Sequence, residues 1–176
     1  HREAMVRLWE INTKHLSKDP HLYIGLLSNL SGGFAVVGNT EKCVPILKKI
    51  AAVVVTEPYH QAYKFKEYQL QFQLYHLNKG TVEEVVANGP ELDAGLRKFK
   101  KSINDSSVLS LRYNQAVAYL ICGEYGQALN QFTRMIGLGK LNVRKDLQGI
   151  SRIVRLLLTA WNDDVGLLHH HLRNFD

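Results

Sequence analysis

The sequence predicts an all-α protein, folded as a solenoid of stacked antiparallel αα-hairpins. Three observations support this prediction. Apolar residues recur at helical spacing, glycine turns follow one another at nearly equal intervals, and no linker rich in Pro, Gly or Ser divides the chain. The 176 residues, 45% of them hydrophobic and 22% charged, suit one folded domain in water. We therefore expect a single helical-repeat domain over residues 1–176.

The clearest hairpin is predicted on the two sides of Gly123. The apolar residues there follow the i, i+3, i+4, i+7 spacing of amphipathic helices; they are Tyr113, Ala116, Val117, Leu120, Tyr125, Ala128, Leu129, Phe132, Met135 and Ile136. Gly123 can adopt the left-handed conformation that ends a helix. Because only about two residues form the turn, the two helices are expected to be antiparallel neighbours.

Two further glycines stand at equivalent places upstream. Gly38, Gly80 and Gly123 are separated by 42 and 43 residues, which indicates an internal repeat with a turn at each glycine. We therefore expect hairpin turns near residues 38–40, 80–82 and 123–125. A fourth turn is expected near 163–165, 40 residues beyond Gly123, although no glycine marks it.

The chain is expected to begin in the middle of a repeat. Apolar residues between Arg2 and Leu16 have helical spacing, and Asp19-Pro20 ends this segment, which we interpret as the second helix of an earlier hairpin. The first residue is not Met. We therefore interpret the sequence as a fragment of a longer chain.

A helix break is predicted in the hairpin that follows Gly80. Asn88-Gly89-Pro90 interrupts a helical pattern that runs from about Val82 to Ile103. Proline lacks a backbone N–H and is tolerated only in the first turn of a helix. We expect a bent or split helix, with Pro90 in the first turn of the resumed part.

One hairpin also carries a family motif. Asn114-x-Ala116-x-x-Tyr119-x-x-x-Gly123-x-Tyr125-x-x-Ala128-x-x-x-Phe132 resembles a tetratricopeptide repeat, and the Gly38 unit keeps Asn29, Phe34, Gly38 and Cys43 in the same order. In such a hairpin Ala128 packs near Ala116, and Tyr125 and Phe132 fill the gap to the neighbouring hairpin. The resemblance implies a right-handed solenoid. It extends to uncharacterised bacterial tetratricopeptide proteins, which implies no activity.

The repeat length departs from that family. The period of 40 to 43 residues exceeds the usual length of about 34. HEAT-like repeats have the longer period and remain the alternative fold. The Gly-x-Tyr turn with its spaced alanines favours the tetratricopeptide interpretation.

The resemblance places the first helix of each hairpin on a concave groove. The residues one step from the packing stripe are Ser28, Asn29, Gly32, Leu70, Gln71, Leu74, Tyr113, Asn114, Val117, Ile153, Val154 and Leu157. The candidate partner-binding residues among them are Asn29, Gln71, Tyr113, Asn114 and Val117. The family often uses an asparagine at the place of Asn29 or Asn114 to hold a backbone amide of its ligand. The same side chains can instead bond neighbouring helices.

A formal charge of +6 and a pI near 9.3 raise the alternative of nucleic-acid binding. Aromatic residues alternate with cations in Tyr63-Lys64-Phe65-Lys66 and in Arg97-Lys98-Phe99-Lys100-Lys101. Both stretches fall on expected helices, where the aromatic residues belong to apolar stripes and the cations to solvated flanks. We favour that interpretation because the remaining cations are dispersed along the chain.

Motifs for catalysis and for metal or cofactor binding are missing from the sequence. His169-His170-His171 lacks the i, i+4 spacing of paired ligands, Gly137-Leu138-Gly139-Lys140 matches a phosphate loop only superficially, and Cys43 and Cys122 form no CxxC pair. No apolar run is long enough to span a bilayer. We expect a cytoplasmic chain that is not an enzyme, uses no cofactor and does not enter a membrane.

These observations predict a non-enzymatic scaffold that binds a protein or peptide in the concave groove. The alternatives are a nucleic-acid-binding helical repeat with a basic surface, and an interaction or regulatory domain of a larger enzyme or regulator.

Overall fold

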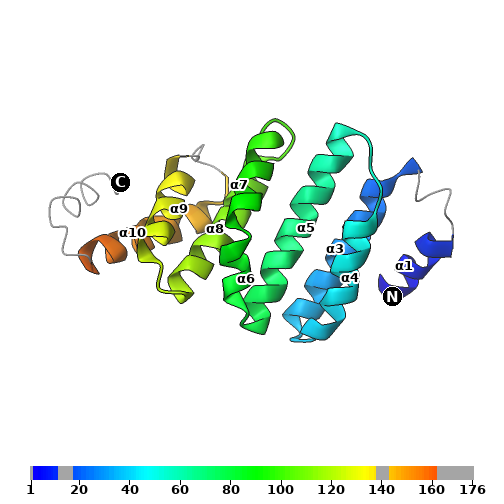
Figure 1. Cartoon of the computed structure of the whole chain (residues 1–176), viewed down its shortest axis with the longest axis horizontal. Coiled ribbons are helices and arrows are strands. Elements are labelled where there is room, and N and C mark those ends of the chain that lie inside the picture. Colours follow the sequence, from blue (N-terminus) through cyan, green and yellow to red (C-terminus); the bar gives the residue numbers. More distant parts are fainter. Residues whose placement is uncertain (1, 12–17, 138–142, 162–176) are drawn as a thin grey trace. The chain divides into compact units, whose positions relative to one another are not determined.

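The computed structural model describes residues 2–11, 18–137 and 143–161 (Figure 1). All of the regular secondary structure in these ranges is helical, which confirms the prediction of an all-α chain for this part of it. The chain divides into two compact units, residues 1–103 and residues 104–176, and each is described by itself. The expectation of one domain over the whole chain stays a prediction.

The first unit contains six α-helices and one short 3-10 helix in its described residues. They are α1 (Arg2–Ile11), α3 (Pro20–Val36), η1 (Thr40–Lys42), α4 (Cys43–Ala52), α5 (Pro58–Lys79), α6 (Val82–Ala87) and α7 (Gly89–Lys98). Pro20 and Pro58 begin α3 and α5, where the missing N–H costs no helical hydrogen bond. Helix α1 falls within the segment that was expected to be helical, and residues 12–17 lie outside the described residues.

Three glycines adopt the left-handed backbone conformation at or just after the end of a helix. Their φ angles are +75° at Gly38, +81° at Gly80 and +77° at Gly123. This conformation, which was expected of Gly123, is readily adopted only by glycine. The expected turn at 163–165 lies outside the described residues.

The break after α6 follows the prediction. Helix α6 ends at Ala87 and α7 begins at Gly89, with Pro90 in its first turn. Helix α7 ends at Lys98, before Ile103, so the second half of this hairpin consists of two short helices.

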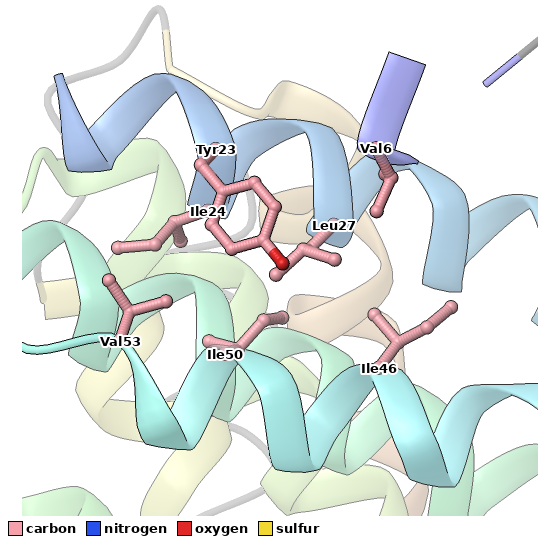
Figure 2. Close-up of a cluster of buried hydrophobic side chains, with 7 residues drawn as sticks. All are labelled: Val6, Tyr23, Ile24, Leu27, Ile46, Ile50 and Val53. Atoms are coloured by element: carbon pink, nitrogen blue, oxygen red, sulfur yellow. The ribbon is translucent and has the colours of Figure 1, made fainter. Parts of the chain in front are cut away.

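Helices α3, α4 and α5 pack side by side (Figure 1). The core between α1, α3 and α4 is a cluster of seven buried side chains, which Figure 2 shows: Val6, Tyr23, Ile24, Leu27, Ile46, Ile50 and Val53. A second cluster joins α3, α4 and α5 through Ala35, Cys43, Leu47 and Tyr75. Because burial of one large aliphatic side chain contributes about 1.5–3 kcal/mol, these clusters fix the positions of the helices.

The second unit contains α8 (Asp105–Ile121), α9 (Tyr125–Gly137) and α10 (Lys145–Trp161) in its described residues. The Asn104 side chain caps α8 by accepting a hydrogen bond of 2.9 Å from the Ser107 backbone N–H. The core of this unit is formed by Leu109, Ala116, Ala128, Phe132, Met135, Leu147 and Leu158.

Ala116 and Ala128 are both fully buried, as their expected packing requires. Tyr125 differs from the expectation, because 43% of it is exposed while Phe132 is fully buried. Tyr125 is the first residue of α9, so its side chain lies at the end of the hairpin rather than inside it.

Within the ranges that the structure describes, none of the helices has both the length and the apolar character needed to cross a membrane.

Candidate functional site

The predicted groove residues of the first unit lie on α3 and α5. Asn29 is exposed on α3, and Gln71 is half-buried on α5. The Gln71 side-chain amide donates a hydrogen bond of 2.9 Å to the Ser28 hydroxyl, and that hydroxyl donates in turn to the Glu67 carboxylate. Ser28 is only 5% exposed. The hydrogen bonds of Ser28 with Gln71 and Glu67 therefore connect α3 to α5.

Small residues on α3 make this close packing possible. A Cβ atom added at Gly25 would lie 3.0 Å from the Tyr63 hydroxyl, and one added at Gly32 would lie 3.7 Å from Gln71 Oε1. Burial, together with the nearby Glu67 charge, raises the pKa of Tyr63 to about 12. This side of α5 is an interhelical contact in which polar side chains lie over glycines.

The other three predicted residues belong to the second unit. Tyr113, Asn114 and Val117 are half-buried on α8. The Tyr113 ring packs edge-on against Phe132, with 6.4 Å between the ring centroids, and belongs to the rim of the apolar core. The structure thus brings Asn29 and Gln71 to one unit and Tyr113, Asn114 and Val117 to the other. The role of these five residues in binding stays a prediction.

A hollow of about 440 Å³ opens along a different face of α5. Its floor consists of Gln61, Lys64, Phe65 and Tyr68, which share one helical face because they follow the i, i+3, i+4, i+7 spacing. Two of these four side chains are aromatic. The floor therefore combines two aromatic rings with one amide and one ammonium group.

Two segments distant in sequence form the walls of this hollow. Ala51 and Val55 come from the end of α4 and the loop after it, and Glu91, Lys98 and Phe99 come from α7 and the residue that follows it. The centroids of the Phe65 and Phe99 rings lie 5.5 Å apart, and the planes of the rings are tilted by 42°. We call this space the aromatic hollow.

Gly95 fixes the position of the Phe65 ring. A Cβ atom added at Gly95 would lie 2.0 Å from Phe65 Cζ, far closer than two non-bonded carbon atoms can approach. Phe65 therefore rests directly on the backbone of α7. The sequence singled out Phe65 and Phe99, but not Gly95, whose only signal was a glycine in the middle of a helix.

Two lysines lie at the hollow. Lys64 Nζ donates hydrogen bonds of 2.6 Å to the Ala51 carbonyl and 2.8 Å to the Val53 carbonyl, both at the C-terminal end of α4. Burial lowers the pKa of Lys64. Lys98 is exposed, and its Nζ lies 5.0 Å from the centroid of the Phe99 ring, within range of a cation–π contact.

The acidic residue of the hollow, Glu91, has two amide partners. It accepts hydrogen bonds from the Gln69 side chain at 3.5 Å and from the Asn88 side chain at 3.1 Å. These partners lie on α5 and at the start of α7, so they help to position the carboxylate. The hollow therefore combines aromatic rings with charged groups of both signs.

The aromatic–cation stretch at residues 63–66 divides between two sides of α5. Lys64 and Phe65 line the hollow, whereas Tyr63 faces Gly25 on α3. Lys66 Nζ lies 4.3 Å from the centroid of the Tyr63 ring and 2.8 Å from a Glu67 carboxylate oxygen. The stretch thus forms no single basic surface.

A second hollow, of about 400 Å³, lies between α1, α3 and α4. Two ion pairs lie in it, Glu3 with Lys42 and Glu10 with Lys49. Glu10 accepts a hydrogen bond of 2.6 Å from Lys49 and one of 2.9 Å from the Tyr23 hydroxyl. The Lys49 hydrogen bond holds the pKa of Glu10 below its usual value, against the opposing effect of burial. These contacts connect α1 to the helices that it covers.

Among the described residues, no three His, Cys, Asp or Glu side chains gather in a group that could hold a metal ion. His169-His170-His171 lies outside the described residues, as does most of Gly137-Leu138-Gly139-Lys140.

Comparison with protein-family models, with curated proteins and with solved structures finds no match to this chain. The resemblance to tetratricopeptide repeats therefore rests on the sequence motif alone and stays a prediction.

Proposed function

We propose that this chain is a non-enzymatic helical-repeat scaffold that binds a segment of another protein. The aromatic hollow carries the proposal. It offers about 440 Å³ of space, a floor with two aromatic rings and charged groups at its edges. Peptide-binding sites commonly combine an apolar recess for an anchor side chain with polar groups that orient the backbone around it.

The repeat pattern supports the same proposal. Left-handed glycines follow one another at intervals of 42 and 43 residues, and buried alanines lie between α8 and α9. We propose that the units belong to a right-handed solenoid of the tetratricopeptide type, in which surfaces between hairpins are used for binding. Such a scaffold is equally suited to serve as the interaction domain of a larger enzyme or regulator.

Filling the hollow tests this proposal. Ala51 lines it and is exposed, so Ala51→Trp places an indole in the space without disturbing a buried side chain. Ala52 is also exposed on α4 but does not line the hollow, which makes Ala52→Trp the matched control.

The experiment selects peptides from a displayed random library on the unmodified chain. We expect selected peptides to bind the unmodified chain and Ala52→Trp equally, and to lose at least about tenfold in affinity for Ala51→Trp. Equal binding to all three proteins, or no enrichment of any peptide, would refute the proposed site.

Nucleic-acid binding is the second candidate function. One observation favours it: Arg97, Lys98, Lys100 and Lys101 are all exposed, and Lys98 Nζ lies 5.0 Å from the centroid of the Phe99 ring. The division of residues 63–66 between two sides of α5 argues against it, because the basic surface does not continue there. Filter binding of single-stranded RNA at low and high salt distinguishes the candidates, since phosphate contacts weaken steeply with salt.

A further inference from the structure

We propose that the aromatic hollow accepts a peptide in which an aromatic or large aliphatic anchor residue is flanked by acidic residues. This inference rests on the proposed function and specifies the chemistry of its partner.

The rings define the anchor. The Phe65 and Phe99 rings contact each other, with 5.5 Å between their centroids and a tilt of 42° between their planes, and the Phe65 ring rests on the backbone at Gly95. Together they present one aromatic surface to the hollow. A flat ring or a branched aliphatic chain can pack on such a surface by edge and face contacts, whereas a small polar side chain would cover little of it.

The two lysines of the hollow determine which residues should flank the anchor in the peptide. Lys64 lies at the α4 side of the hollow and Lys98 at the α7 side. The two carbonyl bonds of Lys64 use two of its three N–H donors, and its third can meet a carboxylate. Lys98 is exposed and can turn from the Phe99 ring to an incoming acid.

Further cations beside the hollow add to its positive charge. Arg97, Lys100 and Lys101 are exposed around the end of α7, next to Lys98. Glu91 opposes them with one negative charge, which the hydrogen bonds from the neutral Gln69 and Asn88 amides do not cancel, but the cations in and beside the hollow outnumber it. An acidic peptide is therefore attracted to this rim, and a basic one is repelled.

Three synthetic peptides of one design test the inference on the whole chain. Each has Phe-Leu as its centre, flanked on both sides by two Glu, two Gln or two Lys, with acetylated and amidated ends. Their affinities are measured by calorimetry at about 0.05 M salt, where screening of exposed charges is moderate. We expect the Glu peptide to bind about tenfold more tightly than the Gln peptide, and the Lys peptide to bind most weakly.

Charge reversal at the rim supplies the decisive comparison. Lys98→Glu should weaken the Glu peptide and strengthen the Lys peptide. Lys48→Glu is the matched control, because Lys48 is exposed on α4, does not line the hollow and makes the same change in net charge. The control should leave the order of the three affinities unchanged.

Other outcomes overturn the inference in distinguishable ways. If the three peptides bind with equal affinity and Ala51→Trp abolishes all of that binding, the charge preference is wrong while the proposed function stands. If none binds, or if Ala51→Trp leaves binding intact, the proposed site fails as well. Competition of a single-stranded RNA oligonucleotide with the Glu peptide, relieved by salt and by Lys98→Glu, would assign the hollow to RNA instead.

Discussion

Gly95 lies directly beneath the ring of Phe65, so closely that a Cβ atom at residue 95 would stand 2.0 Å from Phe65 Cζ. The Phe65 ring of α5 therefore contacts the backbone of α7 directly, with no side chain between them. The Phe65 ring in turn forms part of the floor of the aromatic hollow. A single missing side chain on α7 thus determines the shape of the candidate site.

Replacing Gly95 by Ala should destabilise the protein by about 1–3 kcal/mol, because the added methyl group overlaps the Phe65 ring and forces α5 and α7 apart. The helix-propensity gain of about 1 kcal/mol from Gly to Ala offsets part of this cost, so the net loss is smaller than the overlap alone would give. Chemical denaturation measures the difference. Gly126→Ala on α9 is the control, since no atom within 4 Å meets its Cβ, and it should be neutral or stabilising. Equal stability of Gly95→Ala and the unmodified protein would contradict the close packing.

Gln71→Ala should cost about 1–2 kcal/mol of stability, because it removes the donor that joins α5 to the buried Ser28 hydroxyl on α3. Thermal and denaturant unfolding measure this loss. Gln127→Ala makes the same chemical change at an exposed position of α9 and should remain within about 0.5 kcal/mol of the unmodified protein. If Gln71→Ala leaves stability unchanged but weakens peptide binding, Gln71 serves a ligand rather than the helix contact.

Ala128→Leu should destabilise the second unit by about 1–3 kcal/mol, since Ala128 is fully buried between α8 and α9 and the larger side chain overpacks the hairpin. Asn130→Leu adds an apolar side chain at an exposed position of the same helix and should change stability little. The two variants are compared in the same unfolding experiment. Equal effects would show that α8 and α9 do not approach closely at Ala128.

The Glu10–Lys49 hydrogen bond predicts a pH-dependent stability difference. The pKa of Glu10 is lower in the folded protein than its ordinary value, so the unfolded chain binds more protons as the pH falls through this range. The contribution is present above the ordinary glutamate pKa of 4.5 and is lost as the pH falls from there through the lower pKa of the folded state. Glu10→Gln should therefore be less stable than the unmodified protein at neutral pH, and the two should converge in acid.

A double-mutant comparison isolates that contact. In a Lys49→Met background the principal cause of the lowered Glu10 pKa is gone, so Glu10→Gln should have a much smaller effect at neutral pH. An effect of unchanged size in that background would assign the role of Glu10 to the Tyr23 hydroxyl, its other hydrogen-bond partner.

The helix ends were predictable because they depend on local backbone chemistry. Gly80 adopts the left-handed conformation that ends α5, and Pro90 restarts a helix after the Asn88-Gly89 step. Apolar spacing likewise placed Ala116 and Ala128 on buried helix faces. Spacing does not determine which flank of a stripe faces a neighbour, so it could not show that the Tyr113 ring packs against Phe132.

The aromatic hollow was not predictable in the same way. Its residues come from α4, α5 and α7, and they meet only because tertiary packing sets the positions of these helices. The sequence marked Lys64-Phe65 and Lys98-Phe99 as two separate aromatic–cation stretches, and the structure places them at one hollow. Contacts between segments so far apart depend on side-chain fit, which a periodic pattern does not contain.

The central claim is that the aromatic hollow receives a side chain from a partner protein. Amide NMR of the whole chain, titrated with a peptide selected on it, tests this most directly. We predict that the largest shifts fall at Lys64, Phe65, Lys98 and Phe99, and that they vanish in Ala51→Trp but persist in Ala52→Trp. Shifts concentrated around Asn29 on α3 or around Asn114 on α8, with none at the hollow, would contradict the claim.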